Sequence, residues 1–139
     1  MKPKMDIPAL QAFVSREFPQ LGDDFLIEEL TEDGVRVRLQ VGKRHLRPGG
    51  TVSGPSMFSL ADVGMYLAIL ARIGPVALAV TTSCSIDFMR KPAAGADLIC
   101  DVRLLKLGRV LAVGDALITS AGQSAPVARA SLTYSIPPK

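Results

Sequence analysis

One acidic residue, Asp62, lies inside an almost wholly apolar stretch, residues 55–74 (PSMFSLADVGMYLAILARIG). A lone carboxylate among apolar side chains is costly, and such groups tend to do chemistry. A helix cap or a partner of the helix dipole fits poorly, because Asp62 lies about two turns into the expected helix and both effects fade within the first turn. A position on a solvated stripe of the helix stays open. We take Asp62 as a candidate base or nucleophile.

A glycine-rich segment, residues 47–54 (RPGGTVSG), precedes the apolar stretch. Pro55 suits the first helical turn, since its missing N–H would be unpaired there. The helix cap then falls at Ser53 or Gly54. Backbone N–H groups at a helix start can polarise a carbonyl group or hold an oxyanion. Together with a carboxylate further along the helix, or from a second subunit, they suit attack on a carbonyl carbon or activation of water.

Other catalytic patterns are not visible. His45 is the only histidine, so a histidine-based site cannot be built within one chain, and we expect a loop or strand-end residue. Cys84 and Cys100 lie in strand-like runs without CxxC spacing. They read as buried thiols, which fits a reducing cytoplasm. We expect no metal site.

The composition predicts a single globular domain spanning residues 1–139, with 48% hydrophobic and 21% charged residues. The net charge is +3, from scattered basic residues, and there is no Trp and only two Tyr. Nucleic-acid binding is therefore not expected, whereas a small anionic ligand is. No signal peptide and no long uncharged apolar run is apparent, so we expect a cytoplasmic protein without a membrane span.

The remaining elements must position the apolar helix. Helical spacing predicts a short amphipathic helix near the N-terminus, and Asp33-Gly34 predicts the turn of a β-hairpin. The predicted elements are a helix over 7–18, strands over 25–30 and 35–41, the long helix over 55–74, and strand runs over 76–88, 97–107, 109–120 and 127–136. A single apolar helix and one antiparallel sheet must cover each other, which predicts an α+β fold with the sheet wrapped around the helix. The uncovered sheet edge predicts an edge-to-edge dimer.

The segments RPGGTVSGPSMFSLADVGMYLA and TTSCSIDFMRKPAAGADL resemble the hotdog-fold acyl-CoA thioesterases, specifically the PaaI-like group connected with phenylacetate degradation. The resemblance runs from about residue 36 to residue 134. It implies a curved antiparallel sheet around a long central helix, a homodimer with joined sheets that can pair into a homotetramer, and active sites at the subunit interface. The implied reaction is hydrolysis of an acyl-CoA thioester, with coenzyme A as part of the substrate and no separate cofactor.

By this resemblance Asp62 is the nucleophile or general base, and Gly54 is the helix-start residue whose N–H polarises the thioester carbonyl. Arg47 stands where the family usually has Asn or Gln, and Ser53 where it often has His. Both are candidate catalytic residues. Arg47 can donate to a carbonyl, pair with Asp62 or bind a CoA phosphate, but it cannot accept a proton from water.

The candidates for substrate and CoA binding are Arg90, Lys91, Lys106, Arg109, Thr82 and Ser83. The four basic residues lie at expected strand ends and turns, where they can hold phosphates or simply be solvated. The two hydroxyl residues belong to a polar patch that begins at Thr81, from which one hydroxyl can reach the neighbouring subunit's site.

Two alternatives stay open. The departures at Arg47 and Ser53 leave room for a non-catalytic acyl-CoA-binding protein on the same fold. A hotdog hydratase or dehydratase fits less well, because those enzymes carry a different motif with His beside the acid.

Overall fold

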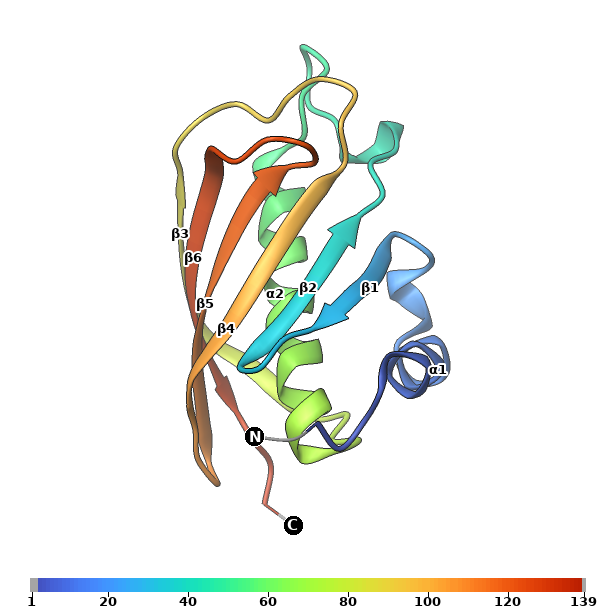
Figure 1. The fold of residues 1–139 in the computed structure, drawn as a ribbon, viewed down its shortest axis with the longest axis vertical. Coiled ribbons are helices and arrows are strands. Elements are labelled where there is room, and N and C mark those ends of the chain that lie inside the picture. The colour runs from blue at the N-terminus through green and yellow to red at the C-terminus, as the bar shows by residue number, and fades with distance from the viewer. Residues whose placement is uncertain (1–2, 139) are drawn as a thin grey trace.

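The apolar stretch around Asp62 forms helix α2 (Gly54–Ile73), and in the computed structural model, which describes residues 3–138, a six-stranded sheet curves around it (Figure 1). Ser53 caps the helix start by accepting a hydrogen bond from the Ser56 N–H at 3.3 Å. Gly74 follows the last turn with φ 97°, a conformation that favours glycine. From Leu60 onward buried residues occur on every side of the helix, as an apolar pattern on all faces predicts.

Helix α2 is long and apolar enough to cross a membrane, but 72% of its most apolar window is buried inside the fold. It is therefore the core helix of this domain, and no membrane span is indicated within residues 3–138.

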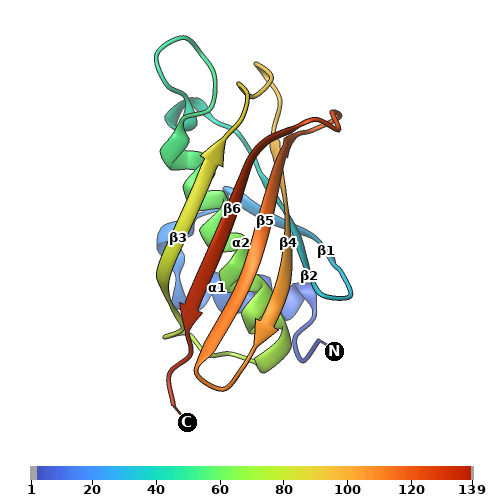
Figure 2. The ribbon, with the colours of Figure 1, turned by 90° about the vertical axis from the view of Figure 1, so that its left-hand side faces the viewer.

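The sheet has the strand order β1-β2-β4-β5-β6-β3, and all neighbours pair antiparallel. The strands are β1 (Phe25–Leu30), β2 (Gly34–Leu39), β3 (Val80–Phe88), β4 (Leu98–Leu107), β5 (Leu111–Ser120) and β6 (Pro126–Ser135). The predicted α+β fold with a sheet wrapped around one helix is confirmed. Strand β3 forms the edge beside β6 (Figure 2), so its outer backbone groups have no partner strand among residues 3–138.

The expected strand over 76–88 begins only at Val80. Tyr66 on α2 donates a hydrogen bond from its hydroxyl to the Ala77 carbonyl oxygen at 2.9 Å. This contact holds the connection between α2 and β3 against the helix rather than in the sheet.

Helix and sheet pack closely at Gly64. A Cβ atom there would lie 2.8 Å from the Val102 side chain of β4, so a larger residue would force the two apart. At the other end of α2, buried Arg72 donates to the Gly34 carbonyl at 2.9 Å and to the Thr31 carbonyl. These bonds tie the helix to the β1–β2 turn and fix it along the sheet.

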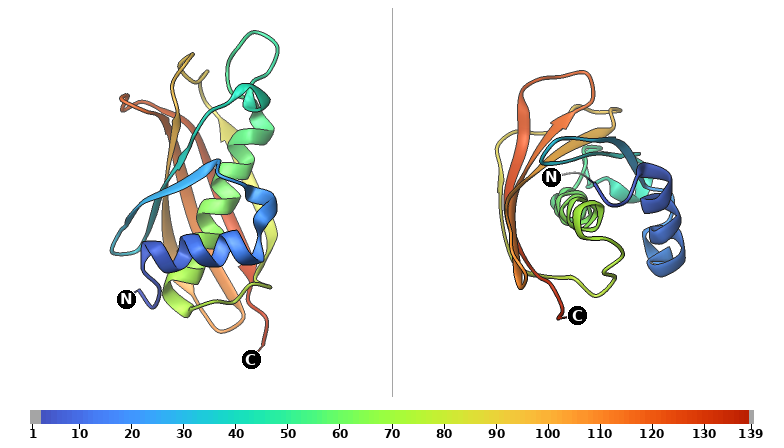
Figure 3. Two further views of the ribbon diagram at one scale, coloured as in Figure 1. Left: turned by 90° about the vertical axis from the view of Figure 1, so that its right-hand side faces the viewer. Right: turned by 60° about the horizontal axis from the view of Figure 1, so that its bottom comes forward.

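The N-terminal helix α1 (Ile7–Glu17) lies outside the curved sheet, against β1 and the open side of α2 (Figure 3). A short 3₁₀ turn, η1 (Pro19–Leu21), follows it. There Phe18 meets Tyr66 edge to face, with ring centroids 6.1 Å apart. Residues 7–21 thus cover the part of α2 that the sheet leaves open, and we call this segment the N-terminal roof.

Candidate active site

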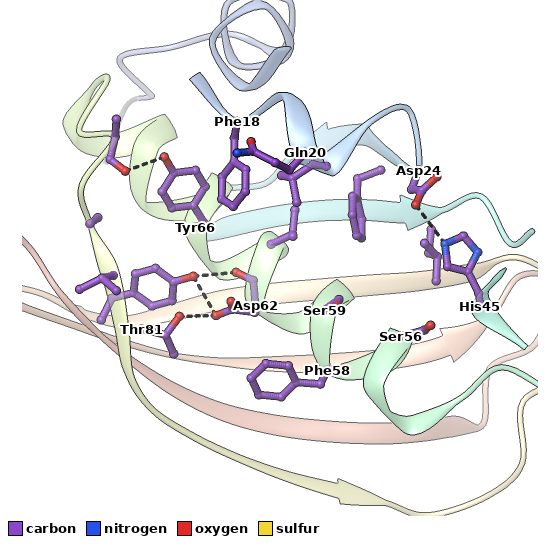
Figure 4. A pocket seen from close by; sticks show the side chains of 18 of the residues that line it. Phe18, Gln20, Asp24, His45, Ser56, Phe58, Ser59, Asp62, Tyr66 and Thr81 are labelled. Atoms are coloured by element: carbon purple, nitrogen blue, oxygen red, sulfur yellow. Dashed lines mark hydrogen bonds and ion pairs between the residues drawn. The ribbon is translucent and has the colours of Figure 1, made fainter. Parts of the chain in front are cut away.

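Asp62 is half-buried on the open side of α2, and two hydroxyl groups from the sheet meet its side chain (Figure 4). Thr81 of β3 donates to Oδ1 at 2.5 Å, and Tyr134 of β6 donates to the same oxygen at 2.8 Å. The Tyr134 hydroxyl also lies 3.0 Å from the main-chain carbonyl oxygen of Asp62. Oδ2 accepts no hydrogen bond from residues 3–138. The carboxylate is therefore held through one oxygen while the other is available.

An irregularity in the β3–β6 pairing places these hydroxyls. Thr81 pairs with Tyr134 and Ser83 pairs with Thr133, so Thr82 is an extra residue without a partner. Such a β-bulge changes which side chains face inward. Continued in the Ser83 register, the strand would set Thr82 opposite Tyr134. The bulge instead puts Thr81 there, where it faces Asp62.

The groups around Asp62 are neutral. Burial raises the pKa of the Tyr134 phenol far above its ordinary value, and the nearby Asp62 charge raises it further. Burial also raises the pKa of the Cys84 thiol on β3, with a smaller contribution from Asp62. Tyr134 is thus a protonated donor, and the Cys84 thiol is not activated as a nucleophile.

Asp62 opens into a cavity of about 560 Å³ between α2, the start of β3 and the N-terminal roof. We call this cavity the chamber. Its walls are largely aromatic and aliphatic, with Phe18, Phe25, Phe58 and Tyr66 among them. Two serines of α2 also line it: Ser59, about one turn before Asp62 on the same face of the helix, and Ser56, nearly two turns before it. The chamber therefore offers an apolar space that leads directly to the carboxylate.

His45 and Asp24 line the chamber away from Asp62. His45 accepts a hydrogen bond from the Gly42 N–H at Nδ1 (2.8 Å), and its Nε2 lies 3.1 Å from Oδ2 of Asp24. Burial lowers the pKa of His45, and the Arg44 charge lowers it further. Neutral His45 thus donates from Nε2 to Asp24 and has both ring nitrogens engaged. It is a loop-fixing residue of the 3₁₀ turn η2 (Lys43–His45), as its isolation in the sequence predicts.

Gly54 lies in a second cavity, of about 390 Å³, which Asp62 does not line. The basic side chains of Arg47, Arg90 and Lys91 border the same space, so four predicted site residues come together here. The ring of Phe88 covers Gly54, and a Cβ atom on the glycine would lie 3.3 Å from it. The Gly54 N–H makes no hydrogen bond with residues 3–138. We call this cavity the basic pocket.

The other predicted residues lie apart from both cavities or have local partners. Ser53 caps α2 and also donates to the Ser56 hydroxyl at 3.0 Å. The Thr82 hydroxyl donates to the Thr133 carbonyl oxygen at 3.2 Å, and Ser83 is exposed on β3. Lys106 and Arg109 flank the β4–β5 turn, where Lys106 lies near Arg72 and hence near the C-terminal end of α2. The roles predicted for these residues stay predictions.

Two candidate residues were not among those selected from the sequence as site residues. Thr81 was visible only as part of a polar patch, and Tyr134 occupies an inward position of the β6 alternation, which is typical of core residues. Tyr134 could have been recognised only by asking which partner its buried hydroxyl finds. No group of three or more His, Cys, Asp or Glu side chains that could hold a metal ion occurs within residues 3–138.

Comparisons with known proteins show the family to which this fold belongs. Residues 49–134 match the family model described as "Thioesterase superfamily". A putative esterase of Pseudomonas aeruginosa is 32% identical over 101 residues, which is 73% of this chain and 74% of the relative. A crystal structure of a putative thioesterase from Silicibacter sp. TM1040 is 56% identical with a TM-score of 0.93, covering 99% of this chain and 96% of that one. The phenylacetic acid degradation protein PaaI of Thermus thermophilus, solved in a mutant form, is 27% identical with a TM-score of 0.73, covering 86% and 99%.

Proposed function

The chain belongs to the thioesterase superfamily and is a thioester hydrolase, and we propose that its substrates are acyl-CoA thioesters with Asp62 as the catalytic carboxylate. One observation supports this proposal: Asp62 lines a largely apolar chamber, and its Oδ2 accepts no hydrogen bond from residues 3–138. The apolar walls of the chamber suit an acyl group. The carboxylate of Asp62 would then lie within reach of the carbonyl carbon of that group.

Asp62 can act in two ways. As a general base, Oδ2 takes a proton from water while the water oxygen bonds to the carbonyl carbon; the C–S bond then breaks, and the proton passes to the departing CoA thiolate. As a nucleophile, Oδ2 itself bonds to the carbonyl carbon, CoA leaves as a thiolate, and water hydrolyses the resulting anhydride. Both routes develop negative charge on the carbonyl oxygen, which an N–H donor must stabilise.

The Gly54 N–H is the donor that we assign to this oxygen, supplied by a second copy of the chain. Strand β3 is an open edge, and it exposes Val80 (56%) at one end and Phe88 (52%) at the other. An antiparallel β3–β3 pairing about a two-fold axis near the middle of the strand sets the second copy's Phe88 beside Val80 of the first. Because Phe88 covers Gly54 and Val80 adjoins Thr81, this pairing carries the basic pocket of one copy toward Asp62 of the other. We therefore propose a homodimer as the smallest active unit.

The basic pocket is the proposed CoA site. Arg47, Arg90 and Lys91 gather around Gly54, and guanidinium and ammonium groups are the usual partners of phosphates. The acyl group would then lie in the chamber of one copy and the CoA moiety against the other. Within one chain Arg47 and Asp62 line different cavities and form no ion pair among residues 3–138, so we assign any Arg47–Asp62 contact to the second copy.

The test is release of free thiol from a panel of short, medium and aryl acyl-CoAs, with the wild type and Asp62→Asn compared side by side. We expect turnover of at least one class by the wild type and its loss in Asp62→Asn. Full activity in Asp62→Asn would show that Asp62 is not the catalytic carboxylate.

A non-catalytic acyl-CoA-binding protein is the second candidate, favoured by Arg47 and Ser53 at positions where the resembled family has amide and imidazole groups. It predicts tight binding of CoA esters without turnover across the same panel. For either function we propose a reducing cytoplasm, since Cys84 and Cys100 are both free thiols.

A further inference from the structure

We propose that Thr81 and Tyr134 are positioning residues for thioester hydrolysis, whose hydroxyls together hold Oδ1 of Asp62 so that Oδ2 is the reacting oxygen. This inference rests on the proposed role of Asp62. It goes further because it assigns different tasks to the two oxygens of one carboxylate and names the residues that separate them.

The geometry fills one oxygen and leaves the other free. A carboxylate oxygen has about two acceptor positions, and Oδ1 receives two donors, from Thr81 at 2.5 Å and Tyr134 at 2.8 Å. The terminal torsion of an aspartate is soft and nearly two-fold, so an unrestrained carboxylate samples many orientations. Donors from two adjacent strands fix that torsion. Oδ2 then has one direction of approach rather than several.

The two donors are neutral, and this preserves the reactivity of the carboxylate. No Arg, Lys or His side chain within residues 3–138 forms an ion pair with Asp62. A guanidinium in the same place would hold the carboxylate more tightly and weaken it as a base. Hydroxyl groups restrain its orientation without placing a positive charge beside it.

Tyr134 also links the side chain of Asp62 to the helix that carries it. Its hydroxyl oxygen lies within hydrogen-bond distance of both Oδ1 and the main-chain carbonyl of Asp62. Since the phenol is buried in the core beside Tyr66, with ring centroids 6.4 Å apart, it has little freedom to move. The bulge at Thr82 completes the arrangement by turning Thr81 inward opposite Tyr134.

The experiment compares Tyr134→Phe, Thr81→Val and Thr81→Ser on one acyl-CoA that the wild type hydrolyses. The first two variants keep shape and remove one hydroxyl each, whereas the third keeps the hydroxyl. We expect kcat to fall about 10- to 100-fold in Tyr134→Phe and Thr81→Val with KM changed less than about threefold, since misplaced reacting groups cost rates of this order. Thr81→Ser should keep most of the wild-type kcat. Thr133→Val is the matched control, because it removes a hydroxyl from the neighbouring residue of β6.

Crystal structures of Tyr134→Phe and Thr81→Val provide a readout independent of turnover. We expect the Asp62 carboxylate to leave its single wild-type orientation in both. Unchanged kcat with only a lower melting temperature, equal loss in Thr81→Ser and Thr81→Val, or an unmoved carboxylate would each overturn the assignment. Failure of the proposed function has a different signature, namely wild-type activity in Asp62→Asn or no turnover of any CoA ester.

Discussion

Helix α2 carries two candidate sites, at Asp62 and at Gly54, which differ in how many hydrogen bonds the chain itself makes to them. At Asp62 every polar contact is made within one chain, by Thr81 and Tyr134 from adjacent strands. At Gly54 the N–H makes no hydrogen bond with residues 3–138, and an exposed aromatic ring, Phe88, covers it. The carboxylate is thus positioned by this chain's own fold, whereas the Gly54 N–H is not engaged by any group within residues 3–138.

The difference indicates how the two halves are used. An N–H at a helix start is a donor for an anion or a polarised carbonyl, and the basic side chains beside Gly54 add to its attraction for a negatively charged ligand. Under the proposed function Asp62 acts beside such a donor, and none contacts it within residues 3–138. A second copy joined through β3 would place Gly54 of each copy near Asp62 of the other. The dimer would then hold two complete sites, one at each end of the shared edge.

The largest expected effect comes from removing the carboxylate. Asp62→Asn should lower kcat about 10³-fold, the usual contribution of a catalytic base, while CoA binding measured by calorimetry stays near the wild-type affinity because the basic pocket is untouched. Asp115→Asn, which removes an exposed carboxylate paired with Arg103, is the matched control and should keep normal turnover. Loss of CoA binding in Asp62→Asn would mean that the two sites are not separate in the way described.

The next prediction tests whether the Asp62 and the Gly54 of one active site belong to different copies of the chain. Gly54→Pro removes the N–H at a helix position that tolerates proline, and Gly54→Ala keeps the N–H while adding the same contact with Phe88. Gly54→Pro alone and Asp62→Asn alone should be nearly inactive. Co-expressed in equal amounts, they should recover about a quarter of wild-type activity, because half of randomly formed dimers are mixed and each mixed dimer has one intact site.

No recovery in purified mixed dimers would place Asp62 and Gly54 of the same chain in one site and refute the shared arrangement. Gly54→Ala controls for the steric contact. If it is as inactive as Gly54→Pro, the loss reflects displacement of Phe88 rather than the missing N–H.

The fold followed from the sequence because its signals were local and strong. The apolar helix, the Asp33-Gly34 turn and the alternation of Val35, Val37 and Leu39 each specify one element, and burial then leaves a single way to combine them. Asp62 was recognisable because it is the one acidic residue in an apolar helix.

Its partners were not recognisable, because a β-bulge has no clear sequence signal. Alternation alone does not say which of Thr81, Thr82 and Ser83 faces the helix, since one extra residue reverses the pattern from that point on. Tyr134 was hidden for a related reason: a tyrosine at an inward strand position looks like core until its hydroxyl partner is known. The separation of Gly54 from Asp62 is likewise a property of three-dimensional cavities and does not follow from their spacing along the helix.

A smaller effect is expected from narrowing the chamber without touching Asp62. Ser59 lines the chamber from α2 and is exposed, so Ser59→Phe can be accommodated without disturbing the core. It should lower kcat/KM for bulky or aryl acyl-CoAs about tenfold relative to acetyl-CoA, which is the scale of discrimination by size in apolar pockets. Ser59→Ala is the control and should leave the preference unchanged. An equal loss for all acyl groups would show that the acyl group does not occupy the chamber.

The smallest effect should come from the exposed basic residues, and it distinguishes the two predicted CoA-binding clusters. Arg90→Ala with Lys91→Ala should raise KM for acyl-CoA about three- to tenfold at low salt and much less at high salt, because exposed charges contribute modestly and are screened. KM for the corresponding acyl-pantetheine, which lacks the nucleotide phosphates, should not change. Lys106→Ala with Arg109→Ala removes the same charge at the far end of α2 and should have the weaker effect, since only the first pair borders Gly54. If the Lys106 and Arg109 variant had the larger effect on KM, the CoA nucleotide would have to bind at the β4–β5 turn and not in the basic pocket.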